Sequence, residues 1–234
     1  MKRIHQGNNQ FEGGMIMKKG LLFAAALVVI LFFLSCTLTF AEELKQVQLP
    51  APQLDGGQPL MQVLKHRKSS REFSSEKLTV QALSNLLWAA FGVNRPDSGK
   101  RTAPSAMNSQ EMDIYVATAD GLFLFDAKAH RLKPVLAEDV RAMTGLQPFV
   151  KEVPLNLIYV ADFSRMGSRT NELKEFYSAA DTGFISQNVY LYCASEGLAT
   201  VVRGLVDKPA LAKAMKLRTD QKITLVQSVG YPRK

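Results

Sequence analysis

The clearest pattern of apolar and polar positions lies between Thr79 and Phe91, where apolar residues recur at helical spacing. Thr79 can accept a hydrogen bond from the first turn, and Gly92 can end the helix. Leu78 and Leu83 occupy the two positions of a hydrophobic staple, which fixes the direction in which the chain enters. The pattern therefore predicts a helix here.

Three later segments have the pattern of strands. Residues 113–118 alternate in part, Asp120-Gly121 is a strong turn signal, and residues 122–125 complete a hairpin. Residues 155–160 are uniformly apolar, which predicts a central strand buried on both faces. Residues 223–229 are rich in β-branched side chains, which predicts a last strand.

Two further helices are expected in the second half of the chain. Residues 179–196 predict a long helix that ends at Gly197, and residues 211–216 predict a short one. Gly183 lies inside the long helix, where a glycine costs about 1 kcal/mol relative to alanine, so we expect close packing at that point. Strands and helices mix without regular alternation, which predicts an α+β layer fold.

The first forty residues follow a different order. Met17-Lys18-Lys19 is basic, Leu21 to Leu34 is apolar and uncharged, and small residues lead to Ala41. This order is typical of a Sec-type signal peptide, so we expect residues 1–41 to be removed after Ala41. The polar segment 1–16 is unusual ahead of a signal and favours Met17 as the true start.

Two alternatives to cleavage stay open. Phe33-Leu34-Ser35-Cys36 resembles a lipoprotein processing site, ranked second because Phe33 stands where a leucine is usual. The apolar run is shorter than the roughly 20 residues of a spanning helix, yet an uncleaved N-terminal anchor is the third alternative. The protein is therefore expected to be exported, periplasmic or extracellular. Membrane attachment is expected only through lipidation of Cys36 or an uncleaved anchor.

The mature chain suits one domain. Residues 42–58 have the composition of a linker, with two prolines, two glycines and no apolar period, so the domain is expected over residues 59–234. The four basic and one acidic residues before Glu42 leave 25 of the 29 Lys+Arg and 20 of the 21 Asp+Glu, about +5. This mild excess contains no basic block, which argues against nucleic-acid binding but suits a phosphate-bearing cofactor.

Cysteine and histidine are scarce in the mature chain. Only Cys193, His66 and His130 remain, so we expect neither an intramolecular disulfide nor a Cys/His metal site. The nucleotide-binding loops G-x-G-x-x-G and G-K-[ST], the G-x-S-x-G elbow and the H-E-x-x-H zinc motif are all missing. Hydrolase functions therefore have little support.

Three segments can carry chemistry. Residues 67–71 hold three cations and two hydroxyls, which can surround a phosphate, although such a cluster is more often a solvated turn. Residues 101–110 are small and polar around Pro104, and they can let a planar ligand approach or form an ordinary loop. Asp181-Thr182-Gly183 opens a helix, and Gly204 can free a backbone amide toward a ligand.

Taken in order, these segments resemble the nitroreductase superfamily of FMN enzymes, and most of all its branch of SagB-type and azoline-oxidising dehydrogenases. Each motif alone is weak, but five in the same order over most of residues 59–234 are specific. The motifs are Arg67-Lys68-Ser69-Ser70-Arg71-Glu72-Phe73, Leu86-Leu87-Trp88-Ala89-Ala90-Phe91-Gly92, Arg101-Thr102-Ala103-Pro104-Ser105-Ala106, Asp181-Thr182-Gly183-Phe184-Ile185-Ser186-Gln187-Asn188 with Glu196-Gly197-Leu198, and Val229-Gly230-Tyr231-Pro232.

The resemblance implies a nitroreductase-like, mostly antiparallel sheet flanked by helices, in a homodimer with two FMN molecules at the interface. Arg67, Lys68 and Ser69 would hold the phosphate and ribityl end. Arg71 would lie near the pyrimidine edge, where positive charge stabilises reduced flavin. The other implied FMN contacts are Pro104, Ser105 and Asn108 from the partner subunit, the Val202-Arg203-Gly204 backbone beside flavin N5, and Arg233 at the phosphate. The family often has an acidic residue at the position of Arg203, so only its backbone role carries over.

The implied chemistry is a two-step transfer of electrons through FMN, in which no side-chain acid or base is required. An exported protein meets little NADH or NADPH, which leaves three hypotheses. The first is a reductase of nitro or quinone-like compounds. The second is an FMN oxidase or dehydrogenase of a peptide-derived ring. The third is an exported binding module without turnover.

Overall fold

The computed structural model describes residues 44–233, and the compact unit begins at Leu44. The predicted signal peptide, the start at Met17 and the processing site at Cys36 lie outside the described residues. Within residues 44–233, no helix is both long enough and apolar enough to cross a membrane.

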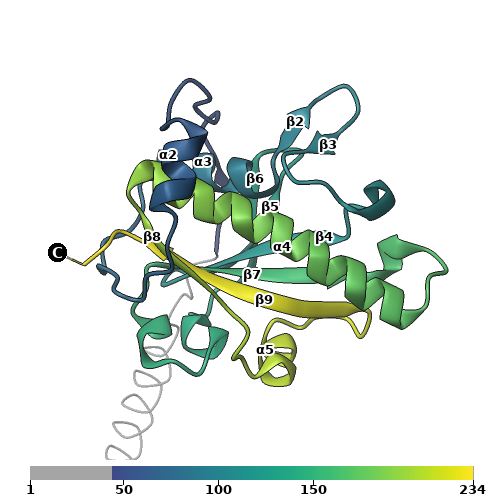
Figure 1. The fold of residues 1–234 in the computed structure, drawn as a ribbon. Helices are drawn as coiled ribbons and strands as arrows, with labels where there is room; N and C mark the ends of the chain where they lie inside the picture. The colour runs from purple at the N-terminus through teal and green to yellow at the C-terminus, as the bar shows by residue number, and fades with distance from the viewer. Residues whose placement is uncertain (1–43, 234) are drawn as a thin grey trace, which may run out of the picture. The chain divides into compact units, whose positions relative to one another are not determined.

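A seven-stranded antiparallel sheet forms the centre of the compact unit (Figure 1). From one edge to the other, its strands are β1 (Val47–Gln48), β6 (Arg131–Leu136), β5 (Gly121–Asp126), β4 (Met112–Thr118), β7 (Leu155–Asp162), β9 (Gln221–Gly230) and β8 (Ala199–Arg203). A separate hairpin joins β2 (Val93–Arg95) to β3 (Lys100–Arg101). Because β8 ends the sheet, one side of its backbone is free to meet other groups.

Helices cover both faces of this sheet. On one face lie α3 (Val80–Phe91) and α4 (Asn171–Glu196), and α5 (Lys208–Ala214) lies on the other (Figure 1). The short helix α2 (Leu60–His66) contacts α4. Residues 44–233 also contain four short 3-10 helices: η1 (Ala106–Asn108), η2 (Arg141–Thr144), η3 (Pro148–Lys151) and η4 (Phe163–Met166). The predicted α+β class is confirmed.

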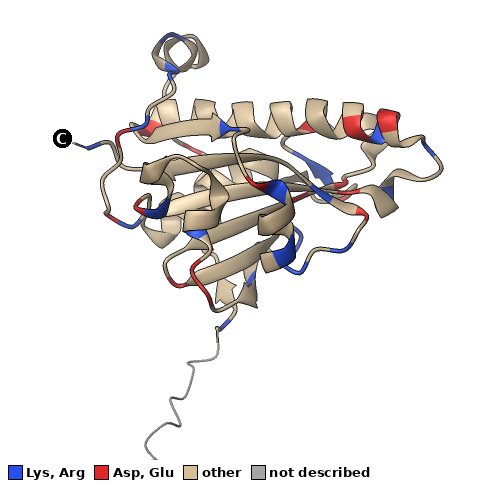
Figure 2. Cartoon of the chain, turned by 90° about the horizontal axis from the view of Figure 1, so that it is seen from below, with Lys and Arg blue, Asp and Glu red and all other residues tan. Residues whose placement is uncertain are grey.

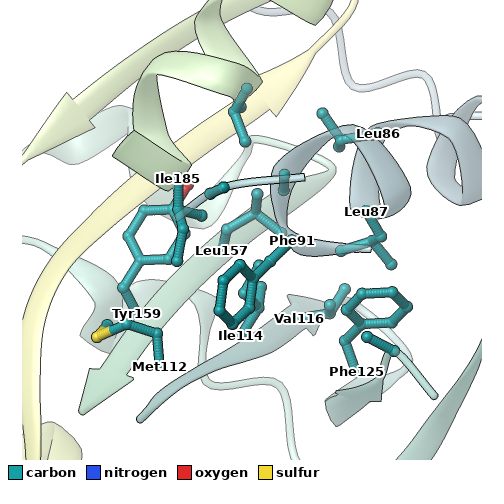
Figure 3. Close-up of a cluster of buried hydrophobic side chains, with 14 of the residues drawn as sticks. Leu86, Leu87, Phe91, Met112, Ile114, Val116, Phe125, Leu157, Tyr159 and Ile185 are labelled. Atoms are coloured by element: carbon teal, nitrogen blue, oxygen red, sulfur yellow. The ribbon is translucent and has the colours of Figure 1, made fainter. Parts of the chain in front are cut away.

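The core lies on both sides of β7, all of whose residues are buried. Leu157 and Tyr159 face α3 and α4, where they pack with Phe91 and Ile185 (Figure 3). The alternate residue Ile158 belongs to the cluster on the α5 side. Burial on both faces explains the uniformly apolar run, and the prediction of a central strand is confirmed.

The predicted ends of α3 and the predicted end of α4 are confirmed, whereas the short helix α5 spans Lys208–Ala214 rather than residues 211–216. The Thr79 side chain accepts a hydrogen bond from Ala82 N at 3.1 Å, and Gly197 ends α4 in the left-handed conformation with φ 70°. However, α4 begins at Asn171 rather than near residue 179, after Thr170 as its N-cap. The first two turns of α4 are mostly exposed, so they have no apolar period to detect.

Two expectations need correction. Residues Val47–Gln48 pair with β6 and Leu49 is 3% exposed, so the compact unit begins at Leu44 rather than near Pro59. The expected linker thus supplies an edge strand. Gly183 is exposed, and no atom lies within 4 Å of a Cβ built there, so it is not a point of close packing within the chain.

Candidate cofactor site

The basic segment after α2 lies along the free edge of β8. Ser70 N donates to Thr200 O at 2.9 Å, which adds the segment to the edge strand. The buried ring of Phe73 anchors its far end, stacked against Phe149 with 5.7 Å between centroids. Around these anchors, Lys68, Ser69 and Arg71 are exposed, and Arg67 is half-buried. The backbone is therefore fixed while the polar side chains stay accessible.

Tyr190 of α4 joins the basic segment to β8. Its hydroxyl lies 2.8 Å from Ser69 Oγ and accepts a hydrogen bond from Val202 N at 2.9 Å. The guanidinium of Arg67 lies over the Tyr190 ring, 5.3 Å from its centroid, within cation–π range. One helix position thus sets the geometry of two predicted motifs. No local signal in the sequence indicates this role of Tyr190.

The C-terminal segment closes a cationic hollow beside the basic segment. Arg233 N donates to Glu72 O, and its Nε donates to Phe73 O, each at 3.3 Å. The hollow has a volume of about 680 Å³ and is lined by Lys65, His66, Lys68, Glu72 and Arg233 among others. Three of these side chains are cationic and one is acidic, so the hollow favours an anion. Lys65 and His66 had not been predicted as site residues.

The side chain of Arg203 turns away from the predicted site, at which only a backbone role was expected for this residue. It is 5% exposed and lies on the face of the sheet opposite α4, hydrogen bonded to Thr144 and Asn156. Val202 is half-buried and Gly204 is exposed at the end of β8. Only the backbone of residues 202–204 can therefore contact a ligand at the free edge.

Pro104, Ser105 and Asn108 do not join this site within one chain. Ala106 N donates to Asp181 Oδ2 at 3.0 Å, which ties the loop to the middle of α4. Asp181 and Tyr190 are nine residues apart on α4, about 14 Å along the axis at 1.5 Å per residue. The loop projects outward, with Asn108 exposed in the left-handed region. A role at the site of a second copy stays a prediction.

The donor set fits the expected cofactor. Arg67 and Ser69 lie at the ring and hydroxyl of Tyr190, and Lys68 and Arg233 line the hollow beside it. Guanidinium, ammonium and hydroxyl groups are the combination that binds a phosphate monoester. On the edge itself, Thr200 O and Val202 N are already hydrogen bonded, and the exposed Gly204 after them leaves room for a planar ring. These are the groups that would hold and orient the expected cofactor.

The comparisons with known proteins agree with this geometry. The model of the nitroreductase family matches residues 64–231. A curated protein of Methanocaldococcus jannaschii that carries a nitroreductase assignment is 32% identical over 169 residues, which are 68% of this chain and 85% of the relative.

Solved structures give the same assignment. A crystal structure from Ralstonia eutropha, also assigned as a nitroreductase, is 43% identical with a TM-score of 0.78, covering 84% of this chain and 93% of the other. A Desulfovibrio desulfuricans nitroreductase-type structure in complex with FMN is 21% identical, with a TM-score of 0.54 over 76% of this chain and 88% of the other. The microcin synthetase complex of Escherichia coli is 19% identical, with a TM-score of 0.62 over 85% and 84%, which supports the fold but does not select a branch.

With the fold, the order of the motifs and the donor set in agreement, the chain belongs to the nitroreductase family and is an FMN-dependent oxidoreductase.

Proposed function

We propose that the protein is an exported FMN reductase of small nitro or quinone-like acceptors, which works as a homodimer with FMN at the free edge of β8. The observation that carries the site is the position of Tyr190, which holds Ser69 and Val202 on either side of its hydroxyl. The basic segment and the cofactor-facing strand end therefore keep a fixed separation.

In this proposal each polar group has one task. Arg67, Lys68 and Ser69 hold the phosphate and ribityl end, and Arg233 adds a phosphate contact. Arg71 lies at the pyrimidine edge, and the backbone of residues 202–204 lies along the ring. Bound FMN supplies the electron-transfer chemistry, and the chain supplies orientation and electrostatics.

A second copy is proposed to complete the site. Leu173, Phe176 and Phe184 leave an exposed apolar stripe along α4, with Phe176 66% and Phe184 48% exposed. Gly183 lies on the same outer face and leaves room for a close neighbour. Charged residues gather mainly at the two ends of α4 (Figure 2). An exposed apolar stripe of this length favours a protein interface, and pairing there would bring residues 104–108 of one copy toward the FMN of the other.

Export is supported by the order of basic, apolar and small residues before Glu42. An exported reductase needs an electron donor other than the cytoplasmic nicotinamides. Cell fractionation tests this part: we expect a product shortened by the signal peptide outside the cytoplasm. A full-length cytoplasmic product would refute export and leave the FMN site untouched.

The cofactor site is tested by the visible spectrum of residues 42–234 after incubation with FMN and desalting. We expect flavin bands at about 370 and 450 nm. Arg67→Ala should weaken FMN binding at least tenfold, because a charge-assisted hydrogen bond contributes about 1.5–3 kcal/mol. Lys133→Ala is the matched control, since Lys133 pairs with Asp126 near the opposite edge of the sheet.

Equal FMN affinities of Arg67→Ala and the parent would refute the phosphate assignment. The FMN-bound protein is then mixed with NADH or NADPH. Rapid bleaching supports the reductase, whereas a flavin that bleaches only with a candidate substrate supports the oxidase or dehydrogenase alternative.

A further inference from the structure

Arg203 is a buried cation whose partners are all neutral. Its Nη1 donates to Thr144 O at 2.7 Å, and its Nη2 donates to Asn156 Oδ1 at 2.9 Å and Ser228 Oγ at 3.0 Å. Its Nε has no hydrogen-bond partner in the described part of the chain. Among residues 44–233, no carboxylate lies within ion-pair distance of this guanidinium. Burial lowers the pKa of Arg203 to about 10.

The surroundings of Arg203 are shaped to admit the guanidinium. Gly145 lies directly against it, and a Cβ there would collide with Arg203 Nη1. The ring of Phe149 lies 5.8 Å from Cζ, within cation–π range. By contrast, Arg141 on the same segment is paired with Asp139. A buried charge without a counter-ion is unfavourable, so an isolated charge held in a fitted pocket calls for a reason other than stability.

The position of Arg203 supplies that reason. It lies between Val202 and Gly204, at the end of the edge strand where the FMN ring is proposed to lie. Phe149 contacts both Arg203 and Phe73, and Phe73 ends the basic segment that holds the phosphate. The guanidinium is thus fixed behind the strand end on which the ring would rest. In such a poorly solvated place a charge acts over a longer range than it does in water.

We propose that Arg203 is a fixed positive charge that makes the site bind reduced FMN more tightly than oxidised FMN. The inference rests on the proposed placement of FMN beside residues 202–204. Uptake of two electrons and one proton by FMN adds one negative charge to the ring, and the reductant supplies the electrons. The guanidinium attracts that added charge without touching the ring, so Arg203 acts through electrostatics and makes no bond in the reaction.

The test compares reduction potentials of the FMN-loaded protein and its variants, titrated with dithionite against a reference dye. The dissociation constant of oxidised FMN is measured in parallel by fluorescence. Arg203→Gln should weaken binding of reduced relative to oxidised FMN at least tenfold, which equals a potential lower by about 30 mV for two electrons. Arg203→Lys should keep the ratio of the affinities for reduced and oxidised FMN within threefold of wild type.

Two further variants separate charge from structure. Asn156→Asp keeps Arg203 but places a carboxylate 2.9 Å from its Nη2. It should therefore lower the affinity for reduced FMN relative to oxidised FMN, as Arg203→Gln does. This variant still tests the charge if Arg203→Gln folds poorly. Ser228→Ala removes a hydrogen bond from the same cluster without changing its charge, and it should keep the wild-type ratio.

An unchanged ratio in both Arg203→Gln and Asn156→Asp would overturn the inference. An equal fall in Ser228→Ala would also overturn it, because the effect would then be structural. If the wild-type protein binds no FMN, the proposed site itself fails, and this inference fails with it. The three results are distinct, because FMN binding and the potential are measured separately.

Discussion

The buried carboxyl group of Glu111 makes the stability of this protein depend on pH in a direction that can be worked out. Glu111 is fully buried, and as a carboxylate it has no hydrogen-bond donor in residues 44–233. Burial is the main cause that raises its pKa from 4.5 to about 7. The neighbouring carboxylate of Asp181 acts in the same direction, and the Glu111 backbone and Arg169 oppose it. Glu111 is therefore protonated in the folded protein at mildly acid pH.

The sign follows from linkage. The folded-state pKa lies above the unfolded value, so the folded protein binds the extra proton between about pH 4.5 and 7. The stabilisation is complete below pH 4.5 and is lost as the pH rises through about 7. A shift of roughly 2.5 pKa units at 1.36 kcal/mol each gives about 3 kcal/mol as an order of magnitude. Most of this change is expected between pH 5 and 8.

Glu111→Gln replaces the carboxyl group by an amide of similar shape that carries no charge at any pH. Its free energy of unfolding should exceed that of wild type by 1–3 kcal/mol (an order-of-magnitude expectation) at pH 8 and match it near pH 5. The assay is urea unfolding of the FMN-loaded protein at fixed protein and FMN concentrations, because both affect stability. Taking the difference at each pH cancels other titrating groups, including His130, whose pKa is lowered by burial.

Glu76→Gln is the matched control, because Glu76 is exposed. The free energy of unfolding of this variant should equal that of wild type at every pH. A difference between Glu111→Gln and wild type that stays constant from pH 5 to 8 would refute the protonated state of Glu111. A Glu111→Gln variant less stable than wild type at pH 8 would show that the carboxylate finds a partner after all.

Two further predictions concern the core and the interface. Tyr159→Phe removes the donor that lies 2.6 Å from Gln227 Oε1, so the free energy of unfolding should fall by about 1–3 kcal/mol in urea titrations. Tyr177→Phe, which removes a hydroxyl without a hydrogen bond in the described residues, should change it little, and equal losses would contradict the assignment. Phe184→Glu should shift the protein from dimer to monomer in light scattering, since it places a charge in the apolar stripe of α4. Val135→Glu on β6 should leave the dimer intact, and a dimeric Phe184→Glu would argue for another interface.

The elements that could be predicted from the sequence are those with a strong local signal. The helix α3 combines an apolar period with a capping side chain at Thr79, and the hairpin of β4 and β5 has its turn residues between two apolar runs. β7 is apolar throughout because both of its faces are buried. In each case the side chains that determine the structure lie within a few residues of one another.

The missed elements have weak local patterns for physical reasons. β6 contains Pro134 and buries only Leu132 among its six residues, so its sequence has no alternation. In α2 only Val63 is buried, and the exposed Leu60, Met61 and Leu64 obscure the helical period. The helix α2 contacts α4, which is distant in the chain, and β6 pairs with the adjacent strand β5 and with the distant β1. A weak local pattern cannot indicate such contacts.

The direction of the Arg203 side chain at the site follows from the strand β8. Residues 199–203 are not among the strands predicted from the sequence. In a strand, Thr200 and Val202 share one face and Val201 and Arg203 share the other. Thr200 contacts Gln227 on the α4 side, so Arg203 has to point to the opposite side. The same alternation places the Arg203 side chain behind the strand end beside which FMN is proposed to lie. Recognising β8 as a strand would therefore have predicted the direction of the Arg203 side chain, whereas its neutral partners come from η2, β7 and β9.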